Sequence, residues 1–465
     1  MNSAVQNVLA EPVAGGDVLE AALHRALAGA RAGAPFACIT VPAPVVSPER
    51  LIAGVRGDAL AWDAPGRFGF CALGEAASVA AAGPTRFDAV RRAGGDLLAQ
   101  VASQGILGAA AVPVRLFGGL SFSGDEPASE LWQPFGAARF VLPALGYLRT
   151  GDQASLFVTV RRGELATPGV RALVVERVLA GLDALAAEPR ADLGVADGYA
   201  LRERPVQEWM ALVESIRREI AAGALEKVVL ARRVRVDFAR EPDPALVLRR
   251  LRGDAPQCVR FLVRRGASSF IGATPERLVH KRGLAVETEA LAGSMSALDA
   301  GGEQRLLEST KDSAEHAIVL REIQRALAPL VDRVEHDRKP ELTRLRHVLH
   351  LRTRVCATLR EPCHLLEVVQ RLHPTPAVGG WPRAAALEWI ARHEPDERGW
   401  YAGPIGWFDA NGDGEMAVAL RSGVLSGRSA HLFVGCGIVG RSNPAQEFAE
   451  TRWKLATLLG ALGAV

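Results

Sequence analysis

The sequence predicts an α+β fold in which helices pack against mostly antiparallel β-sheets. Three observations favour this class. Of the 465 residues, 49% are hydrophobic, which is enough for a large core. Runs with the period of a strand and runs with the period of a helix both recur along the chain. No Ser/Pro-rich linker divides it, so one large domain built from two halves is as admissible as two or three domains.

Composition narrows the classes of partner. The formal net charge is only +3 and no block of like charge stands out, so neither nucleic acid nor an anionic membrane surface is expected. No apolar run approaches the roughly 20 residues of a membrane span. Acidic Glu11 and Asp17 lie where a signal peptide would be basic and then apolar, which favours a cytoplasmic protein with a small-molecule partner. The six scattered cysteines are expected to be reduced.

The first 200 residues are expected to be mainly structural. Helical patterns cover residues 17–32 and 87–103, and strand patterns cover residues 36–41, 138–148 and 155–161. A Gly-rich passage at residues 117–125 is typical of a loop. Because this half holds few candidate catalytic groups, we expect a structural unit over residues 1–200 and a boundary within residues 188–203.

The sequence patterns that predict helices and strands are clearer from residue 205 onward. An amphipathic helix is predicted over residues 206–222, and Gly223 ends it. The strand that follows, over residues 225–236, places Lys227, Val229 and Ala231 on one face. Further strands are predicted at residues 258–264, 416–425 and 430–434, and one long helix at residues 303–330.

Lysine is rare in this chain. The only lysines are Lys227, Lys281, Lys311, Lys339 and Lys454, whereas arginine is about tenfold more frequent. Where arginine has replaced lysine so widely, a remaining lysine can mark a place that needs a compact or deprotonatable amine. Chance retention at the surface is the alternative for any one of them.

The last helix carries the clearest local pattern. Asn443 suits the N-cap and Pro444 the first helical position, so a helix is expected to run to about residue 459. Glu447, Glu450 and Lys454 then share one face. A second helix repeats the theme with Lys311, Asp312, Glu315 and His316. Magnesium needs only one or two protein carboxylates, so two such helices could hold it; a solvated, ion-paired face is the alternative for each helix.

Two further motifs are expected to carry no function. Residues 435–440 (GCGIVG) match the dinucleotide pattern GxGxxG, but the chain ends 25 residues later without a βαβ unit. Residues 409–414 (DANGDG) resemble the start of an EF-hand loop, but Leu420 stands where a bidentate Glu belongs. A surface hairpin turn is the better interpretation of the second motif.

Six motifs in order resemble the chorismate-utilising enzymes. They are residues 225–232 (LEKVVLAR), 272–278 (GATPERL), 287–294 (ETEALAGS), 311–316 (KDSAEH), 373–380 (HPTPAVGG) and 447–451 (EFAET). The detailed resemblance spans residues 205–461, and residues 132–135 (WQPF) resemble the family's N-terminal half more loosely. It implies a single large domain of two similar halves, with a structural half over 1–200 and a chorismate-binding catalytic half over 205–461.

The resemblance also implies roles for single residues. Lys227 matches the general base, Glu276 the general acid and His350 a histidine near the leaving hydroxyl. Glu315 and Glu450, with Glu447 beside them, match ligands of a Mg²⁺ cofactor. The substrate chorismate would contact Gly293, Ser294, Thr375, Ala377, Leu420, Arg421, Gly435, Gly437 and Lys454. An Arg fork suits a carboxylate, and glycines allow close backbone approach.

Within this family, the residues most resemble the isomerases that convert chorismate to isochorismate by adding water at C2 and releasing the C4 hydroxyl. Relatives that use ammonia generally lack a lysine at the position of Lys227, so water is the implied nucleophile and no amidotransferase subunit is expected. Salicylate synthase, which goes on to eliminate pyruvate, shares these residues and remains an alternative. A non-catalytic sensor of an anionic metabolite is the other alternative. A monomer is expected, and the pathway, whether menaquinone, siderophore or salicylate, is left open.

Overall fold

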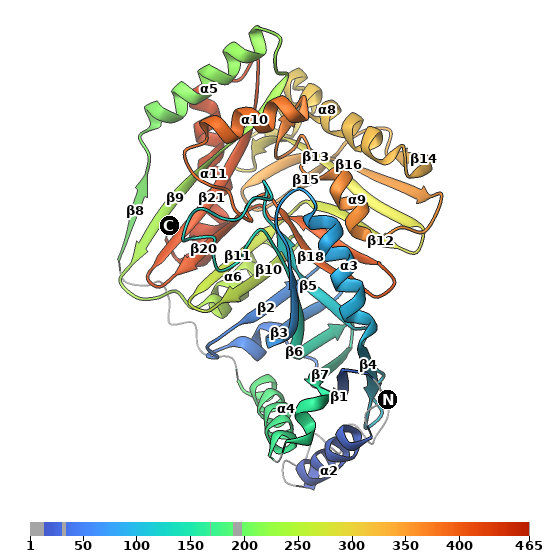
Figure 1. The fold of residues 1–465 in the computed structure, drawn as a ribbon. Helices are drawn as coiled ribbons and strands as arrows, with labels where there is room; N and C mark the ends of the chain where they lie inside the picture. The colour runs from blue at the N-terminus through green and yellow to red at the C-terminus, as the bar shows by residue number, and fades with distance from the viewer. Residues whose placement is uncertain (1–13, 30–33, 168, 189–197, 465) are drawn as a thin grey trace.

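The computed structural model describes residues 14–29, 34–167, 169–188 and 198–464. Their strands join into one curled sheet, with helices at both ends and along its sides (Figure 1). Among the strand pairings of these residues, only β1 with β4 is parallel. The predicted α+β class, mostly antiparallel and covered by helices, is therefore confirmed. No helix in these ranges is long and apolar enough to cross a membrane.

The first part of the chain forms the end of the sheet that α2 and α4 cover, at the bottom of Figure 1. Its elements are α2 (Ala14–Ala28), β1 (Phe36–Pro42), β2 (Ala59–Asp63), β3 (Gly69–Ala80), α3 (Arg86–Ala99), β4 (Val101–Gly105), β5 (Arg115–Leu120), β6 (Ala138–Thr150), β7 (Gln153–Arg161) and α4 (Val170–Ala186), with short 3₁₀ turns at Pro48–Ile52 and Arg162–Ala166.

The second part of the chain forms the other end. Its elements are β8 (Tyr199–Glu203), α5 (Val206–Ala221), β9 (Lys227–Phe238), α6 (Pro244–Asp254), β10 (Val259–Arg265), β11 (Ser268–Thr274), β12 (Arg277–Arg282), β13 (Ala285–Ser296), α7 (Gly302–Glu308), α8 (Thr310–Leu327), β14 (Val331–His336), β15 (Glu341–Arg344), β16 (Val348–Leu359), α9 (Leu365–Leu372), β17 (Gly380–Trp381), α10 (Arg383–His393), β18 (Pro404–Asp409), β19 (Gly414–Val418), β20 (Ser422–Ser426), β21 (Ser429–Val439) and α11 (Pro444–Leu462).

Strand pairing joins the two parts directly. β2 pairs with β10 and β5 pairs with β18, both antiparallel. The sheet is therefore continuous across the predicted boundary at residues 188–203, of which 189–197 lie outside the described residues. The division into a structural half and a catalytic half stays a prediction.

Several predicted elements have different bounds in the structure. The helix predicted at 87–103 ends at Ala99, and Val101–Gly105 form β4 instead. Phe117 to Leu120 belong to β5 rather than to a loop. The helix predicted at 303–330 is two helices, because Ser309 caps α8 by accepting a hydrogen bond from the Asp312 backbone N–H. The strand predicted at 416–425 is two, β19 and β20. Of the helix predicted at 17–32, residues 30–32 lie outside the described ranges.

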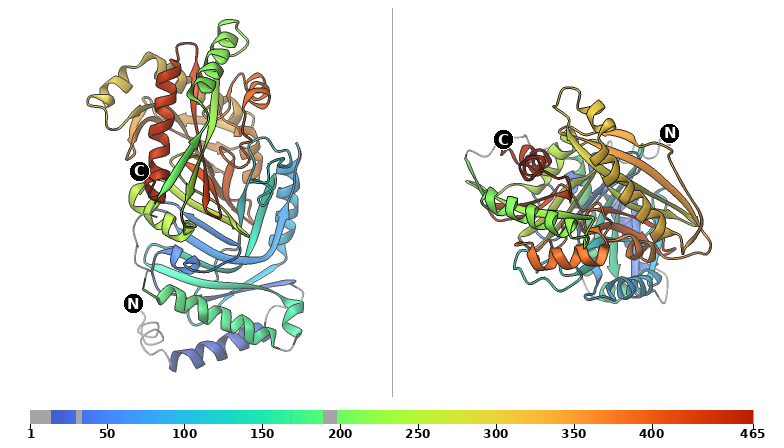
Figure 2. Two further views of the ribbon diagram at one scale, coloured as in Figure 1. Left: turned by 90° about the vertical axis from the view of Figure 1, so that its left-hand side faces the viewer. Right: turned by 90° about the horizontal axis from the view of Figure 1, so that it is seen from above.

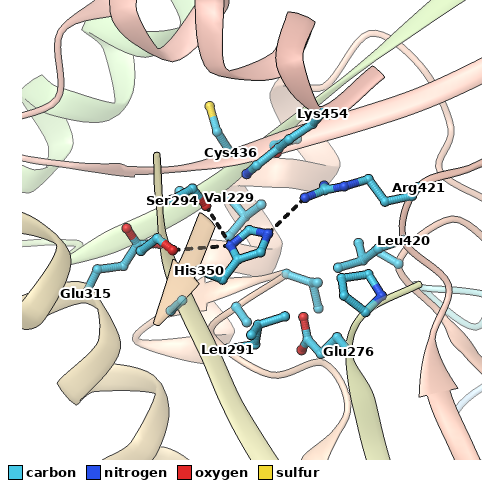
Figure 3. A pocket seen from close by; sticks show the side chains of 18 of the residues that line it. Val229, Glu276, Leu291, Ser294, Glu315, His350, Leu420, Arg421, Cys436 and Lys454 are labelled. Atoms are coloured by element: carbon cyan, nitrogen blue, oxygen red, sulfur yellow. Dashed lines mark hydrogen bonds between the residues drawn. The ribbon is translucent and has the colours of Figure 1, made fainter. Parts of the chain in front are cut away.

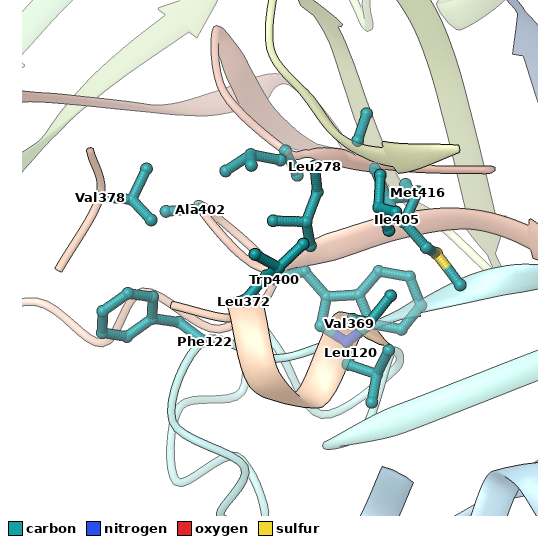
Figure 4. Packing of buried hydrophobic residues seen from close by; sticks show 14 of the residues in the cluster. Leu120, Phe122, Leu278, Val369, Leu372, Val378, Trp400, Ala402, Ile405 and Met416 are labelled. Atoms are coloured by element: carbon teal, nitrogen blue, oxygen red, sulfur yellow. The ribbon is translucent and has the colours of Figure 1, made fainter. Parts of the chain in front are cut away.

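The hydrophobic core lies between the curled sheet and the helices on its faces. One part of it joins α9, β5, β12, β18 and β19, where Trp400 packs among Leu120, Val369 and Ile405 (Figure 4). Trp400 is 1% exposed, and its indole N–H donates to the Gly136 carbonyl, so the ring is fully buried with its polar atom satisfied. Val378 and Ala402 belong to the same cluster.

Strand β9 and helix α11 form the frame of the second part. β9 pairs with β21 along its whole length, with Val229 opposite Gly437 and Ala231 opposite Gly435. As predicted, Asn443 begins α11: its side chain accepts hydrogen bonds from two backbone N–H groups of the first turn. α11 packs on β21 and lies beside α5 (Figure 2). This packing turns the face that carries Glu447 and Lys454 inward, where both are buried.

Candidate active site

A cavity lies between β9, β13, β16, β21 and the helices α8 and α11. Thirteen of the twenty residues that line it are buried and the other seven are partly exposed, so the cavity is mostly buried. Eleven of the residues predicted for the site line it: Glu276, Gly293, Ser294, Glu315, His350, Ala377, Leu420, Arg421, Gly435, Gly437 and Lys454. Figure 3 shows their arrangement, with Glu315, Lys454 and Glu276 on different sides of His350.

Three lysine–glutamate pairs meet behind and beside one wall of this cavity. Lys227 Nζ lies 2.8 Å from Glu315 Oε1, Lys311 Nζ lies 2.7 Å from Glu447 Oε1, and Lys454 Nζ lies 2.6 Å from Glu450 Oε1. Lys454 also donates to the Gly435 carbonyl at 3.1 Å. Three of the five lysines are therefore gathered at one place, from one strand and two helices.

The carboxylates in these pairs differ in their electrostatic environment. Burial disfavours ionisation of Glu315, but the charges of Lys227, Lys311 and Lys454 outweigh it and lower its pKa. Burial, together with the charge of Glu450, raises the pKa of Glu447 despite its contact with Lys311. The wall thus holds one carboxylate whose ionisation the lysines favour and one whose ionisation burial disfavours.

Lys227 lies at the end of β9 and is fully buried. Its ammonium is close to Glu315, yet the angle is too poor for a hydrogen bond, so within the described part of the chain Nζ has no well-aligned acceptor. It does not itself line the cavity; Gly437 stands between. A Cβ on Gly437 would lie 2.5 Å from Glu315 Oε1 and 2.7 Å from Lys227 Cε. The bare glycine therefore leaves room for the ion pair.

The substitution Gly437→Ala is expected to lower kcat/KM at least tenfold. Its methyl group would displace Lys227 and Glu315, and a small misplacement of catalytic groups costs about 10²-fold. The substitution Gly440→Ala, on the same segment, is the matched control, because its Cβ would meet only Ile220 Cγ2 at 3.4 Å. Steady-state kinetics of the two variants check this, and equal activity in both would contradict it.

Glu276 faces the cavity from the loop between β11 and β12. Its backbone N–H donates to Thr274 Oγ1, which holds the turn around Pro275. The side chain is 4% exposed. Burial, and then the negative charge of Glu289, raise the pKa of Glu276 from its ordinary value of 4.5 to about 8, although Lys227, Arg421 and Lys454 act in the opposite direction. The group is therefore protonated near neutral pH, which a general acid requires.

His350 lies at the centre of the cavity, and its tautomer follows from its neighbours. Nδ1 lies 3.2 Å from the Gly293 carbonyl, which can only accept, so Nδ1 carries the proton. Nε2 lies 3.1 Å from Arg421 Nη2, which can only donate, so Nε2 accepts (Figure 3). Burial, with the charges of Arg421 and Lys454, holds the pKa of His350 well below its ordinary value. A neutral His350 therefore orients the guanidinium of Arg421.

Arg421 occupies an unusual backbone position. It follows β19 with φ of 48°, a left-handed conformation that costs energy for a residue with a side chain. Arg421 is 9% exposed, and no carboxylate of the described residues lies within ion-pair distance of its guanidinium. A buried cation without a partner is costly, so Arg421 is suited to an anionic ligand.

Some predicted site residues lie elsewhere. Thr375 lines a different pocket, together with Trp381 and Arg383, and its hydroxyl has no hydrogen-bond partner among the described residues. Glu447 and Glu450 lie behind the cavity lining, in contact with their lysines. No three His, Cys, Asp or Glu side chains of the described ranges converge as a ready metal cage. One or two carboxylates with substrate and water suffice for magnesium.

Nine of the twenty lining residues were not predicted from the sequence, among them Arg398 and Tyr401. Arg398 pairs with Glu394, both 4% exposed, and donates to the carbonyls of Val229 and Val378 at 2.7 Å. Glu394 in turn accepts from the Ala231 N–H at 2.8 Å. This buried pair fixes β9 just beyond Lys227. Its i,i+4 spacing was a readable signal, but many such pairs are exposed and carry no information.

The cavity thus combines a protonated carboxyl, a buried ammonium and an unpaired guanidinium, as an enzyme acting on a small anion requires. Comparison with known proteins agrees: residues 29–463 match the family described as chorismate binding enzyme. The salicylate biosynthesis isochorismate synthase of Pseudomonas aeruginosa is 36% identical over 416 residues, which cover 87% of this chain and 85% of that protein. The isochorismate synthase of Bacillus subtilis is 37% identical, covering 76% of this chain and 75% of that protein.

Solved structures give the same result. The menaquinone-specific isochorismate synthase of Escherichia coli superposes with a TM-score of 0.77 at 28% identity, covering 96% of this chain and 99% of that one. An anthranilate synthase component I from Streptococcus pneumoniae, at 21% identity and a TM-score of 0.69, shares the fold. The chain belongs to the family of chorismate-binding enzymes.

Proposed function

We propose that this protein is an isochorismate synthase, which interconverts chorismate and isochorismate. The observation that carries the proposal is that a protonated carboxyl lines the cavity while a buried lysine lies directly behind Gly437 in its wall. Glu276, with its pKa raised to about 8, can give a proton, while Lys227 beside Glu315 is placed to remove one. A protein that only bound an anionic metabolite would need neither, so a sensor is disfavoured. Relatives that cover most of the chain bear the same activity in their names.

The reaction is an allylic displacement by water. Lys227, in its neutral form, takes a proton from a water molecule whose oxygen bonds to C2 of chorismate. Both ring double bonds shift as the C4–O bond breaks, C1=C2 becoming C1=C6 and C5=C6 becoming C4=C5, and Glu276 protonates the departing hydroxide, which leaves as water. No net oxidation occurs, and in the reverse direction the two residues exchange roles.

Cations and close backbone would hold the substrate. Chorismate carries two carboxylates, and Arg421, oriented by His350, offers its fork to one of them. Lys454 and the backbone at Gly435 and Gly437 would contact the other end, with Ser294, Ala377 and Leu420 against the ring. In this arrangement His350 is a positioning residue for Arg421.

The residues fit a magnesium ion. Glu315 and Glu450 offer hard carboxylate oxygens from α8 and α11, and burial, then the negative charge of Glu450, raises the pKa of Glu447, a cost that a divalent cation would reduce. Such an ion would neutralise a substrate carboxylate when bound. Lys227, Lys311 and Lys454 are each paired with one of the three glutamates that would hold the ion.

The substitution Glu450→Gln is expected to raise the magnesium concentration for half-maximal activity at least tenfold, because a neutral amide is a poor ligand for this ion. A magnesium titration of activity, with calorimetry of binding, measures the change. Glu322→Gln, on the same helix as Glu315 but paired with Arg325, is the control and should leave the titration unchanged. An unchanged titration for Glu450→Gln would place the metal elsewhere.

One assay tests the function itself. Purified protein is incubated with chorismate and magnesium, and the products are separated by chromatography. Isochorismate alone supports the proposal. Salicylate with pyruvate would identify a salicylate synthase instead, and no turnover would leave a binding protein. Because water is the nucleophile, we expect activity from this chain alone, without an amidotransferase subunit, and as a monomer.

A further inference from the structure

A second pocket lies against the active-site cavity and shares one residue with it, Arg421. It forms between the C-terminal end of α6, the turn from β15 to β16, and α11. Its rim is exposed at Gly253, Arg344 and Arg346, whereas Cys258, Ala273 and Arg421 form a buried floor. The pocket thus opens to solvent on one side and reaches the Arg421 side chain on the other.

The active-site cavity is mostly buried. Thirteen of its twenty lining residues are buried and seven are partly exposed, so an adjoining pocket that opens to solvent offers a ligand a way toward it. Arg421 lines both the open pocket and the active-site cavity, and it is buried, without a carboxylate partner among the described residues. A ligand that enters past the exposed rim would reach that cation at the floor.

The charges of the open pocket suit an anion. Arg344, Arg346 and Arg421 contribute three positive charges to its lining, against one negative charge from Asp254. An ion pair of Arg346 with Asp254 spans the rim, from the β15–β16 turn to the end of α6. Arg344 is held by Glu303, which lies outside the lining. Arginine side chains along a concave wall raise the local concentration of anions and speed their association.

We infer that this pocket is the access route of a small dicarboxylate to the active site, with Arg421 as the cation that passes the ligand from one chamber to the other. The inference rests on the proposed function for the identity of the ligand as chorismate. Arg346, across the rim from Asp254, steers the anion but does not take part in the reaction. Its effect therefore appears in association and fades as salt screens the charges.

The test reverses one charge at the rim. In Arg346→Glu the association rate of chorismate, followed by stopped-flow tryptophan fluorescence, is expected to fall roughly tenfold at low ionic strength and to approach the wild-type rate at high salt. kcat/KM should fall with it, while kcat stays unchanged. Arg360→Glu is the matched control, since it breaks a similar exposed pair, with Asp332, outside both pockets. A second variant, Gln257→Trp, fills the rim without changing charge and should slow association at every salt concentration.

The outcomes separate this inference from the proposed function. If wild-type protein makes isochorismate but Arg346→Glu and Gln257→Trp bind chorismate as fast as Arg360→Glu, the access route is wrong and the function stands. If wild-type protein binds chorismate without turnover, the function fails while the comparison of association rates still decides the route. Failure to bind chorismate at all would overturn both.

Discussion

The substitution Glu276→Gln is expected to lower kcat/KM by about 10²–10⁴-fold, the usual contribution of a general acid. Glutamine keeps the size of the side chain but cannot give a proton to the hydroxide that leaves C4. Wild-type activity should fall above about pH 8, where Glu276 loses its proton, and the residual activity of the variant should lack this limb. Initial rates across pH measure both effects, and a variant with the wild-type profile would remove Glu276 from the reaction.

The same substitution should stabilise the fold, which serves as its internal control. Below pH 4.5 the carboxyl is protonated in both the folded and the unfolded chain, so its raised pKa has no effect on stability. Between 4.5 and about 8 the unfolded chain ionises while the folded protein holds the proton, so the stability of the wild type falls as pH rises. The melting temperature of Glu276→Gln should therefore exceed that of the wild type by more at pH 8 than at pH 5. A lower melting temperature at both would mean that lost activity reflects damage to the fold.

Local signals predicted the frame of this site well. Asn443 and Pro444 set the start of α11, and hence the shared face of Glu447, Glu450 and Lys454. The alternation around Lys227 placed it on a strand, and its burial agrees with the apolar residues on the same face. Caps and periods act over a few residues, so they can be read without knowing the tertiary structure.

Tertiary contacts decided what the sequence patterns did not. Gly118 and Gly119 suggested a loop, but they lie in β5. Glycine is needed there for close packing, because a Cβ at Gly118 would be 1.9 Å from the Arg139 carbonyl oxygen and one at Gly119 would meet the Trp400 ring at 2.7 Å. The break between β19 and β20 also depends on a tertiary contact. It places Arg421 in a left-handed conformation, from which its side chain reaches His350. Which lysine pairs with which glutamate across α8, α11 and β9 depends on helix packing, which spacing along one helix cannot specify.

A substitution in the ion pair of Lys227 with Glu315 is expected to have large effects on both catalysis and stability. Replacement by methionine preserves the packing of the side chain beside Gly437 but removes the amine. We expect kcat/KM to fall by about 10²–10⁴-fold, because no base remains to activate water. We also expect the free energy of unfolding to fall by about 3–5 kcal/mol, because the charge of Glu315 loses its partner inside the protein.

Two further variants separate these effects. Lys281→Met removes another buried lysine, whose ion pair with Asp413 lies outside the cavity lining, so it should lower the melting temperature while leaving kcat per folded molecule unchanged. The double variant Lys227→Met with Glu315→Gln removes both charges of the pair and should recover most of the lost stability without recovering activity. Water addition at the wild-type rate in folded Lys227→Met would show that another group activates the water. A second substitution at Glu315 can thus restore the stability lost with the Lys227 amine, but it cannot replace the base that the reaction needs.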